Sequence, residues 1–250
     1  MKILISVISY NEEANIEATL RDLLDHDLGY DIVVIDNGSS DRTSLICREL
    51  GVRVVRHCVN TGSSVGTLLS YFNYAYANDY DVLCQFDADG QHKADELNRI
   101  IAPVQAGEAD VVIGSRFIER VGFQSTATRR IGIWLFSRLF SRVTGVHVTD
   151  ITSGFRAYSR KVIVFFGHTY RDPIYDSMNQ FLLLAHFAGF RIAEVPVTMR
   201  SRQFGQSEFN LWNSIAFPVK GVMTFITCLL QRRRINALGP ASLARDAQVK

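Results

Sequence analysis

Short apolar segments alternate with segments of helical periodicity in the first half of the chain, and this alternation restricts the fold more than any other feature. Each apolar segment has the length of a strand, and together they cover residues 3–9, 32–35, 52–55, 82–86 and 111–113. Strands that are apolar throughout and separated by helices form a mostly parallel sheet that is covered on both faces. The sequence therefore predicts an α/β fold with such a sheet at its centre.

Helical periodicity predicts the connecting elements, and it continues into the second half. We expect helices at 11–26, 42–50, 63–77, 94–105, 129–143 and 177–188, a strand opening at 153–156 and another at 191–197. Residues 211–230 are apolar but interrupted by Asn213, Pro218 and Lys220, and Arg232–Arg234 follow them. We therefore expect one domain over residues 1–210 and a C-terminal amphipathic helix with a basic tail over 211–250.

Polar residues gather where the predicted strands end. Ligands of such sheets bind outside the carboxyl ends of the strands, which meet at one edge. The polar residues at these ends are Tyr10, Glu12, Asp36, Asn60, Asp87, Asp89, Ser115 and Arg116. Five strand ends with polar groups predict a single site along one edge of the sheet.

The segment QFDADGQH places two carboxylates one residue apart after the fourth strand, at Asp87 and Asp89. Two convergent carboxylates and the amide oxygen of Gln91 form a hard oxygen set that suits Mg²⁺ or Mn²⁺. The alternative is an Asp- and Gly-rich turn that caps the following helix. The triplet alone does not decide between a metal site and a turn.

Other strand ends leave similar alternatives open. Asp36 begins the segment DNGSSD. It is either part of a tight turn before a capped helix or an acceptor for a hydrogen bond from a base or ribose. A phosphate-binding loop of the lysine-containing kind is excluded, because no Gly-Lys-Ser/Thr string follows a glycine-rich segment.

Charge and composition limit the partners. The net charge of +2 gives no support to a general role in nucleic-acid binding. Local clusters at Arg129–Arg130, Arg200 with Arg202, and Arg232–Arg234 are suited to phosphates or an anionic membrane surface. The four cysteines lack metal spacing and favour reduced thiols in a cytosolic protein. The chain starts with a strand pattern and has no run of about 20 apolar residues, so we expect a cytoplasmic protein without a spanning helix.

The motifs resemble a known family when they are taken together. The pieces that carry the resemblance are SYNEEANI, VVIDNGSSDRT, NTGSSVG, QFDADGQH, ADVVIGSRF, DITSGFRAYSRK and EVPVTMRSRQFGQS. Their order and spacing are similar to those of the family 2 glycosyltransferases with the GT-A fold, especially the dolichyl-phosphate mannosyltransferase-like branch. The resemblance extends from about residue 3 to residue 207. It implies a nucleotide-sugar-binding half over 1–118 and an acceptor half over 119–210.

The resemblance also implies roles for individual residues. Nucleotide-sugar contacts are expected from Tyr10, Glu12, Asp36, Asp87, Arg116, Arg200, Arg202 and Ser207. Metal contacts are expected from Asp87, Asp89 and Gln91. The segment with Arg200, Arg202 and Ser207 matches a mobile loop that closes on the diphosphate in the family, and guanidinium groups bind phosphate oxygens in a fork.

The implied reaction is an inverting displacement at the anomeric carbon of a UDP-, GDP- or dTDP-linked sugar. The metal ion and the arginines stabilise the charge on the departing diphosphate. A hydroxyl acceptor needs a general base, whereas a lipid phosphate is already ionised. Asp176 is the nearest match to the family's base but is out of register, and it is also a candidate helix cap. Asp150 is the second candidate base, and its alternative role is to hold the acceptor or a neighbouring arginine.

The acceptor stays open between a glycan hydroxyl, carried on a lipid, and a polyprenyl phosphate. Relatives hold the lipid phosphate with an arginine followed by a serine, whereas Arg129–Arg130 precede Ile131, Gly132 and Ile133. The helix at 129–143 and the segment 215–230 are candidates for peripheral membrane contact. Their alternative is burial against the domain or in a homodimer.

Two other classes of function remain as alternatives. A nucleotidyltransferase that makes a nucleotide-sugar shares the sheet and the metal, but it needs a glycine-rich loop with Lys or Arg after the first strand, which SYNEEANI lacks. A non-catalytic nucleotide-sugar-binding protein does not need the acidic triplet together with Arg200 and Arg202.

Overall fold

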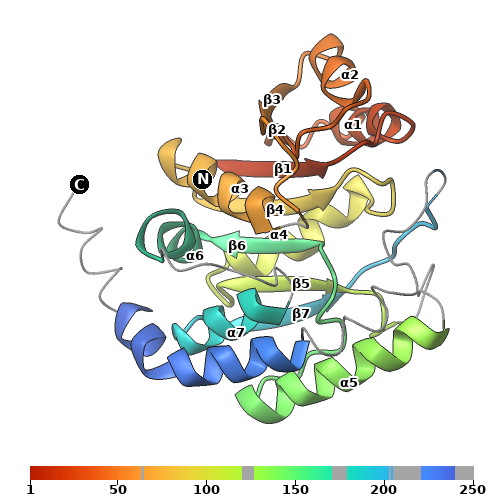
Figure 1. Cartoon of the computed structure of the whole chain (residues 1–250). Helices are drawn as coiled ribbons and strands as arrows, with labels where there is room; N and C mark the ends of the chain where they lie inside the picture. Colours follow the sequence, from red (N-terminus) through yellow and green to blue (C-terminus); the bar gives the residue numbers. More distant parts are fainter. Residues whose placement is uncertain (63–64, 120–126, 171–178, 203, 205–220, 240–250) are drawn as a thin grey trace.

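The computed structural model describes the chain except for residues 63–64, 120–126, 171–178, 203, 205–220 and 240–250 (Figure 1). Within the described part, the strands form one seven-stranded sheet in the order β3-β2-β1-β4-β6-β5-β7. The strands are β1 (Ile3–Ser9), β2 (Asp31–Asp36), β3 (Arg53–Arg56), β4 (Val82–Asp87), β5 (Val111–Ser115), β6 (Arg156–Ser159) and β7 (Ile192–Pro196). Only β6 is antiparallel to its neighbours, β4 and β5, among these strands. The predicted α/β class with a mostly parallel sheet is confirmed.

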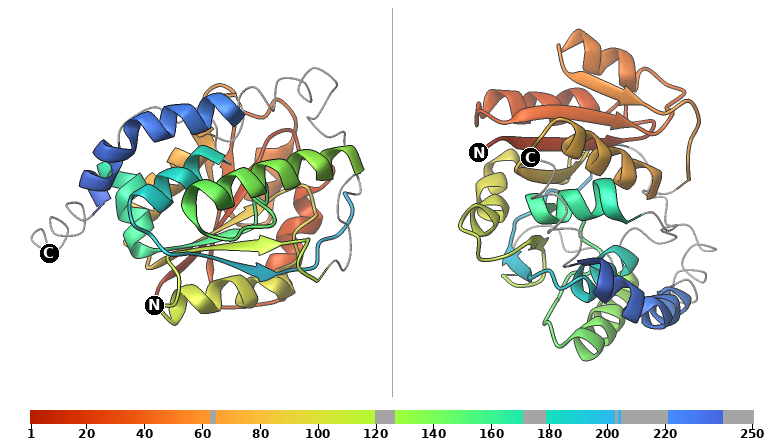
Figure 2. Two further views of the ribbon diagram at one scale, coloured as in Figure 1. Left: turned by 90° about the horizontal axis from the view of Figure 1, so that it is seen from below. Right: turned by 90° about the vertical axis from the view of Figure 1, so that its left-hand side faces the viewer.

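Helices cover both faces of the sheet, as predicted (Figure 2). One face carries α1 (Ile16–Asp25), α2 (Thr43–Glu49) and α4 (Leu97–Gln105), which a 3₁₀ turn at Ala94–Glu96 precedes. The other face carries α3 (Val65–Ala77), α5 (Ala127–Thr144), α6 (Arg160–Val164), α7 (Asn179–Phe187) and a further helix over 221–239.

The second face is built around packed aromatic rings. The ring of Phe72 on α3 stacks on Phe166 at 5.3 Å and on Phe181 of α7 at 5.6 Å between centroids. Tyr158 of β6 lies 5.0 Å from the same Phe72 ring. Such buried rings bring large apolar areas together, and they fix β6 against its helices.

The helix over 221–239 packs beside α5 and α7 (Figures 1 and 2). Gly221 lies directly against the ring of Phe136 on α5, where a Cβ would not fit. Arg232 lies over the ring of Phe187 at 5.3 Å. A C-terminal helical extension is thus present from residue 221, whereas the first part of the predicted segment lies outside the described residues.

One predicted helix start was wrong, and one helical segment was not predicted. The helix expected from residue 11 begins at Ile16, because Asn11 adopts a left-handed φ of 52° and its Oδ1 accepts a hydrogen bond from the Ser40 N–H at 2.8 Å. Helix α6 and the π-helical turn at Phe165–Thr169 were not predicted. The apolar run VIVFF is too short for periodicity to distinguish a helix from a strand.

Candidate active site

The carboxyl ends of the strands bring the predicted polar residues to one edge. The register pairs Ser9 with Asp36 and Ile8 with Asp87, so the ends of β1, β2 and β4 are level. The chain turns sharply after β4, where Gly90 has a φ of 77°. The side chains of Asp87 and Asp89 are 36% and 18% exposed at this turn. Both carboxylates are therefore within reach of a ligand that approaches this edge.

The side chain of Asp87 is oriented by hydrogen bonding to Gln85 and by close packing against Gly154. Gln85 Oε1 accepts hydrogen bonds from the hydroxyls of Tyr71 and Tyr158, each at 3.1 Å. These bonds direct the Gln85 amide group to the Asp87 carboxylate, to which it is hydrogen-bonded. On the other side, a Cβ at Gly154 would lie only 2.5 Å from Asp87 Oδ2. The glycine of SGFR is required here because the carboxylate occupies the space of a side chain.

His92 supports the same turn and was not singled out from the sequence. Its Nδ1 accepts a hydrogen bond from the Asp87 N–H at 2.9 Å, and its ring stacks on Phe155 at 4.5 Å. Burial lowers the pKa of His92 to about 4, so the ring is neutral near pH 7. A histidine that directly follows an acidic turn in a strand-like context is the sequence signal for this role.

Arg116, after β5, forms a buried ion pair with Asp150. Arg116 Nε lies 2.6 Å from Asp150 Oδ2, and Nη2 lies 2.8 Å from Oδ1. Asp150 is fully buried. Both of its oxygens are therefore occupied by the same guanidinium group, and this favours the second predicted role of Asp150, which is to hold a neighbouring arginine. Asp150 Oδ1 also accepts a hydrogen bond from the Thr152 hydroxyl at 3.2 Å, so the buried carboxylate is engaged by two neighbouring side chains.

The backbone of the Asp150 loop is itself fixed by Glu194 of β7. Glu194 Oε1 accepts the Asp150 N–H at 2.7 Å, and Oε2 accepts the Thr149 N–H at 2.9 Å. Burial raises the pKa of Glu194, while these backbone hydrogen bonds oppose that shift. The carboxylate thus holds the loop rather than facing a ligand.

Arg202, in the segment that follows β7, lies beside the acidic turn. Its Nη2 donates to Glu12 Oε1, its Nε donates to the Phe204 carbonyl at 2.8 Å, and its Nη1 lies 4.0 Å from Asp89 Oδ2. Glu12 also accepts a hydrogen bond from Asn15 Nδ2 at 2.6 Å. Arg202 therefore lies between two of the predicted ligand-binding acids.

Arg200 differs from Arg202 in its surroundings. Its Nη1 donates to Asp22 Oδ2 on α1 at 3.2 Å. Its N–H donates to the Gln91 carbonyl at 2.9 Å, and Gln91 Nε2 lies 3.4 Å from the Arg200 carbonyl. The structure thus brings Arg202 to the acidic turn and directs the Arg200 side chain to α1. The Gln91 amide nitrogen faces a backbone carbonyl in this arrangement.

The second strand end is occupied by a hydrogen-bonded loop. Asp36 is fully buried, accepts hydrogen bonds from Ser39 and Ser44, and lies 3.5 Å from Arg56 Nε. Gly38 has a φ of 77° and passes so close to Val59 that a Cβ would clash. Asp36 therefore fixes this loop, which is the turn alternative, and its carboxylate does not face outward in this structure. Tyr10 follows β1 with an exposed ring.

Sequence reasoning did not single out Asn37 or Arg156. Asn37 Nδ2 donates to Asn60 Oδ1 and to the Gly62 carbonyl, each at 3.0 Å, and so joins two loops of the site. Arg156 is buried in β6, donates to the Ile151 carbonyl at 2.8 Å, and its charge acts on Asp87. The sequence signal for Arg156 is a cationic residue of the motif SGFR at the start of an apolar strand.

Two predicted residues, Asp176 and Ser207, lie outside the described part of the chain.

The acidic turn fits a divalent cation. Within the described residues, no group of three or more His, Cys, Asp or Glu side chains is arranged to hold a metal. Mg²⁺ in nucleotide sites is held through one or two carboxylates, while substrate phosphates and waters complete its coordination. Burial raises the pKa values of Asp87 and Asp89, and the Asp87 charge adds to the effect on Asp89. A divalent cation bound here would oppose these shifts, so the two carboxylates fit such an ion.

A mixed sheet with this strand order, an acidic turn after β4 and helices on both faces defines the GT-A class of fold. The chain belongs to the family described as "Glycosyl transferase family 2", whose sequence profile matches residues 4–165. It is accordingly a glycosyltransferase, and this excludes the alternatives of a nucleotidyltransferase and a non-catalytic binding protein.

Several characterised relatives cover most of the chain. A polyprenol monophosphomannose synthase of Mycolicibacterium smegmatis is 31% identical over 83% of this chain and 80% of its own length. An undecaprenyl-phosphate mannosyltransferase of Micrococcus luteus is 30% identical over 84% of this chain and 88% of its own. A UDP-N-acetylglucosamine–dolichyl-phosphate N-acetylglucosaminyltransferase of Methanococcus voltae is 29% identical over 76% and 82%. These similarities agree with the predicted branch of the family.

Solved structures agree with the fold. Glucosyl-3-phosphoglycerate synthase from Mycobacterium tuberculosis, in complex with Mn²⁺, UDP-glucose and phosphoglyceric acid, superposes with a TM-score of 0.67 at 20% identity. The match covers 91% of this chain and 79% of that one. The same enzyme with Mn²⁺, UDP and glucosyl-3-phosphoglycerate gives a TM-score of 0.64 at 21% identity, over 92% and 79% of the two chains.

The contrast between the two arginines gives a first prediction. Arg202→Ala should weaken binding of a nucleoside diphosphate by about 10- to 100-fold, because a hydrogen bond to a charged group contributes about 1.5–3 kcal/mol. Arg200→Ala is the matched control and should change this affinity less, since its side chain contacts Asp22 of α1, whereas Arg202 lies beside Asp89. Calorimetric titration with UDP and GDP in the presence of Mn²⁺ measures both. A larger loss for Arg200→Ala would contradict the arrangement described above.

Proposed function

We propose that this glycosyltransferase is metal-dependent and inverting, and that it transfers a sugar from a nucleotide-sugar to a polyprenyl phosphate in the synthesis of surface polysaccharides or glycoconjugates. The observation that carries the choice of acceptor is the Arg116–Asp150 pair. A glycan hydroxyl needs a base, and among the described residues on the acceptor side Asp150 and Glu194 are both occupied. A phosphate acceptor is ionised and needs none. The names of the relatives support the same acceptor.

The reaction is then a single displacement. A phosphate oxygen of the acceptor attacks the anomeric carbon, the bond from that carbon to the donor diphosphate breaks, and the nucleoside diphosphate leaves with the electron pair. The cation, when bound, stabilises the charge on the leaving group. Asp87 and Asp89 are the residues proposed to hold it, and Arg202 adds a guanidinium group beside them.

Binding of the donor is assigned to the loops at the sheet edge. Tyr10 offers an exposed ring after β1. Glu12 and Arg202 form an ion pair beside the acidic turn. In this proposal, the diphosphate group of the donor replaces Glu12 as the partner of Arg202. Arg116 stays bound to Asp150 and contributes its positive field to the two acids of the turn.

Peripheral attachment to a membrane brings the enzyme to such an acceptor, and the two neighbouring helices support it. Within the described residues, no helix is both long and apolar enough to cross a bilayer. Large apolar side chains nevertheless point outward from α5 and from the helix over 221–239. They are Ile131, Trp134, Leu135, Val222, Met223, Ile226, Leu229 and Leu230. Exposed apolar patches of this kind mark interaction surfaces. A location at the inner face of the membrane follows from the proposal, and a homodimer through this surface is the alternative.

The acceptor class is tested by direct comparison of two lipids. Sugar transfer from a panel of UDP-, GDP- and dTDP-sugars should proceed to a polyprenyl phosphate and not to the corresponding polyprenol, and EDTA should stop it. Asp176→Asn should keep a near-normal rate with the phosphate, because no base is required. The control is the same variant with the polyprenol. Transfer to the polyprenol by the wild type, lost in Asp176→Asn, would instead establish a hydroxyl acceptor with Asp176 as its base.

A further inference from the structure

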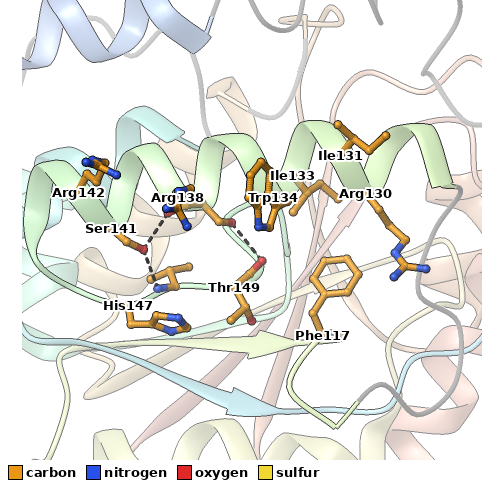
Figure 3. A pocket seen from close by; sticks show the side chains of 12 residues that line it. Phe117, Arg130, Ile131, Ile133, Trp134, Arg138, Ser141, Arg142, His147 and Thr149 are labelled. Carbon is orange, nitrogen blue, oxygen red and sulfur yellow. Dashed lines mark hydrogen bonds between the residues drawn. The ribbon is translucent and has the colours of Figure 1, made fainter.

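A groove of about 880 Å³ runs along the outer side of α5, between this helix and the loop that follows it (Figure 3). One end is formed by Arg130 and by Phe117, and Phe117 directly follows Arg116 of the active site. The other end gathers Arg138, Arg142 and His147 (Figure 3). Arg138 lies two turns of helix beyond Arg130, or about 12 Å at 1.5 Å per residue. The two ends therefore present separate positive charges.

The charge of the distal end is not balanced by acids. None of the residues that line the groove is an Asp or Glu. In the part of the chain that the structure describes, no carboxylate forms an ion pair with Arg138 or Arg142, whereas eight other arginines have such a partner. Arg138 instead lies 5.7 Å from the centre of the exposed ring of Trp134. Unpaired cations in a concave site attract anions.

The wall of the groove is rigid at this end. Ser137 Oγ donates to the Thr149 carbonyl at 3.1 Å and Ser141 Oγ accepts the Val148 N–H at 3.2 Å, so that two serines of α5 hold the loop with His147 (Figure 3). Thr149 is held in turn by Glu194 from β7. The groove is therefore built before any ligand enters it.

The apolar surroundings decide which anion fits. Trp134 is 60% exposed and Leu135 is 54% exposed, both on the same outer side of α5 as the distal arginines. On the neighbouring helix, Leu230 is 81% exposed and precedes Arg232–Arg234. A surface that combines protruding apolar side chains with arginines matches the headgroup layer of an anionic bilayer, where aromatic rings and cations meet phosphates.

We infer that the distal end of this groove, formed by Arg138, Arg142 and His147, binds the phosphate headgroup of an anionic phospholipid. The site is separate from the Arg130 end of the groove, which lies nearer the active site. The inference depends on the proposed function only for the presence of a membrane. In this arrangement, the phospholipid holds α5 on the bilayer while the other end of the groove stays open to a polyprenyl phosphate.

The experiment measures binding of the full chain to vesicles, without donor or acceptor. Wild-type protein should sediment with vesicles of phosphatidylcholine mixed with phosphatidylglycerol more strongly than with phosphatidylcholine alone. Arg138→Gln with Arg142→Gln should lower partition onto the mixed vesicles about 30-fold, from about 1 kcal/mol per arginine near an anionic surface, and should leave binding to phosphatidylcholine unchanged. The matched control is Arg21→Gln with Arg48→Gln, which removes two exposed arginines from α1 and α2 and should bind like the wild type.

Several outcomes would overturn the inference. The first is equal binding of the groove variant and the wild type to the mixed vesicles, and the second is an equal loss on both kinds of vesicle. Release of the wild type by inorganic phosphate, at an ionic strength matched with sodium chloride, would show a small-anion site instead. A wild type that forms dimers and ignores vesicles would show that a second copy covers this surface. Failure of sugar transfer leaves all of these readouts intact, so the two proposals fail separately.

Discussion

Replacing Asp89 by alanine should lower kcat/KM for sugar transfer by about 10³-fold, because stabilisation of the leaving group by a bound cation contributes several kcal/mol. Asp89 Oδ1 makes one backbone hydrogen bond, to the Gln91 N–H at 3.1 Å. Loss of this hydrogen bond to a charged group costs about 1.5–3 kcal/mol of folding stability, and removal of the repulsion between Asp89 and Asp87 offsets part of it. The variant should therefore remain folded while it loses its response to Mn²⁺.

Three measurements separate the metal role from simple misfolding. Turnover is followed as a function of Mn²⁺ concentration, binding of the nucleoside diphosphate is measured with and without Mn²⁺, and thermal unfolding reports the fold. Asp95→Ala is the matched control, since it removes an exposed carboxylate six residues away that is paired with Lys93. Normal turnover of Asp89→Ala would show that the turn does not hold the metal.

Replacing Asp150 by alanine should lower the free energy of unfolding by about 3–5 kcal/mol, because it leaves a buried guanidinium group without its partner. Arg116 is only 6% exposed and loses both of its short contacts to Asp150. Urea denaturation measures the change. Glu17→Ala is the control, because it breaks an exposed ion pair with Arg21 and should cost about 1 kcal/mol or less.

A second substitution distinguishes the structural role of Asp150 from that of a base. Arg116→Leu combined with Asp150→Leu should recover most of the lost stability, since apolar residues often replace a buried ion pair at little cost. If Asp150 were the base, Asp150→Asn would instead abolish turnover while stability stayed normal. That outcome would return Asp150 to the catalytic role that the sequence left open.

The strands and their edge could be predicted because apolar strands end abruptly in polar residues. QFDADGQH is an example, since Phe86 is buried while the next residue, Asp87, is partly exposed. The same logic predicted Arg116 at the end of β5. Such features depend on residues that are adjacent in the chain, and their chemistry can be read from the sequence.

The partners of these residues could not be predicted in the same way. Arg116 and Asp150 are separated by 34 positions, and Arg202 and Glu12 by 190 positions. Which acid meets which arginine depends on the three-dimensional course of the loops. For Asp36 the partners are near in the chain, at Ser39 and Ser44, but the sequence left open whether its carboxylate fixes a turn or faces a ligand. It also gave Arg200 and Arg202 one role, whereas Arg200 pairs with Asp22 of α1 and Arg202 pairs with Glu12.

The position of β6 in the sheet has a consequence for folding of the chain during its synthesis. β6 lies between β4 and β5, and β7 covers the other side of β5, yet both β6 and β7 come later in the chain. During synthesis, β5 therefore emerges with neither of its partner strands, and β4 has one open edge. Open strand edges pair readily with other chains. We therefore expect residues 1–118 alone to expose the edges of β4 and β5 and to aggregate more readily than the full chain.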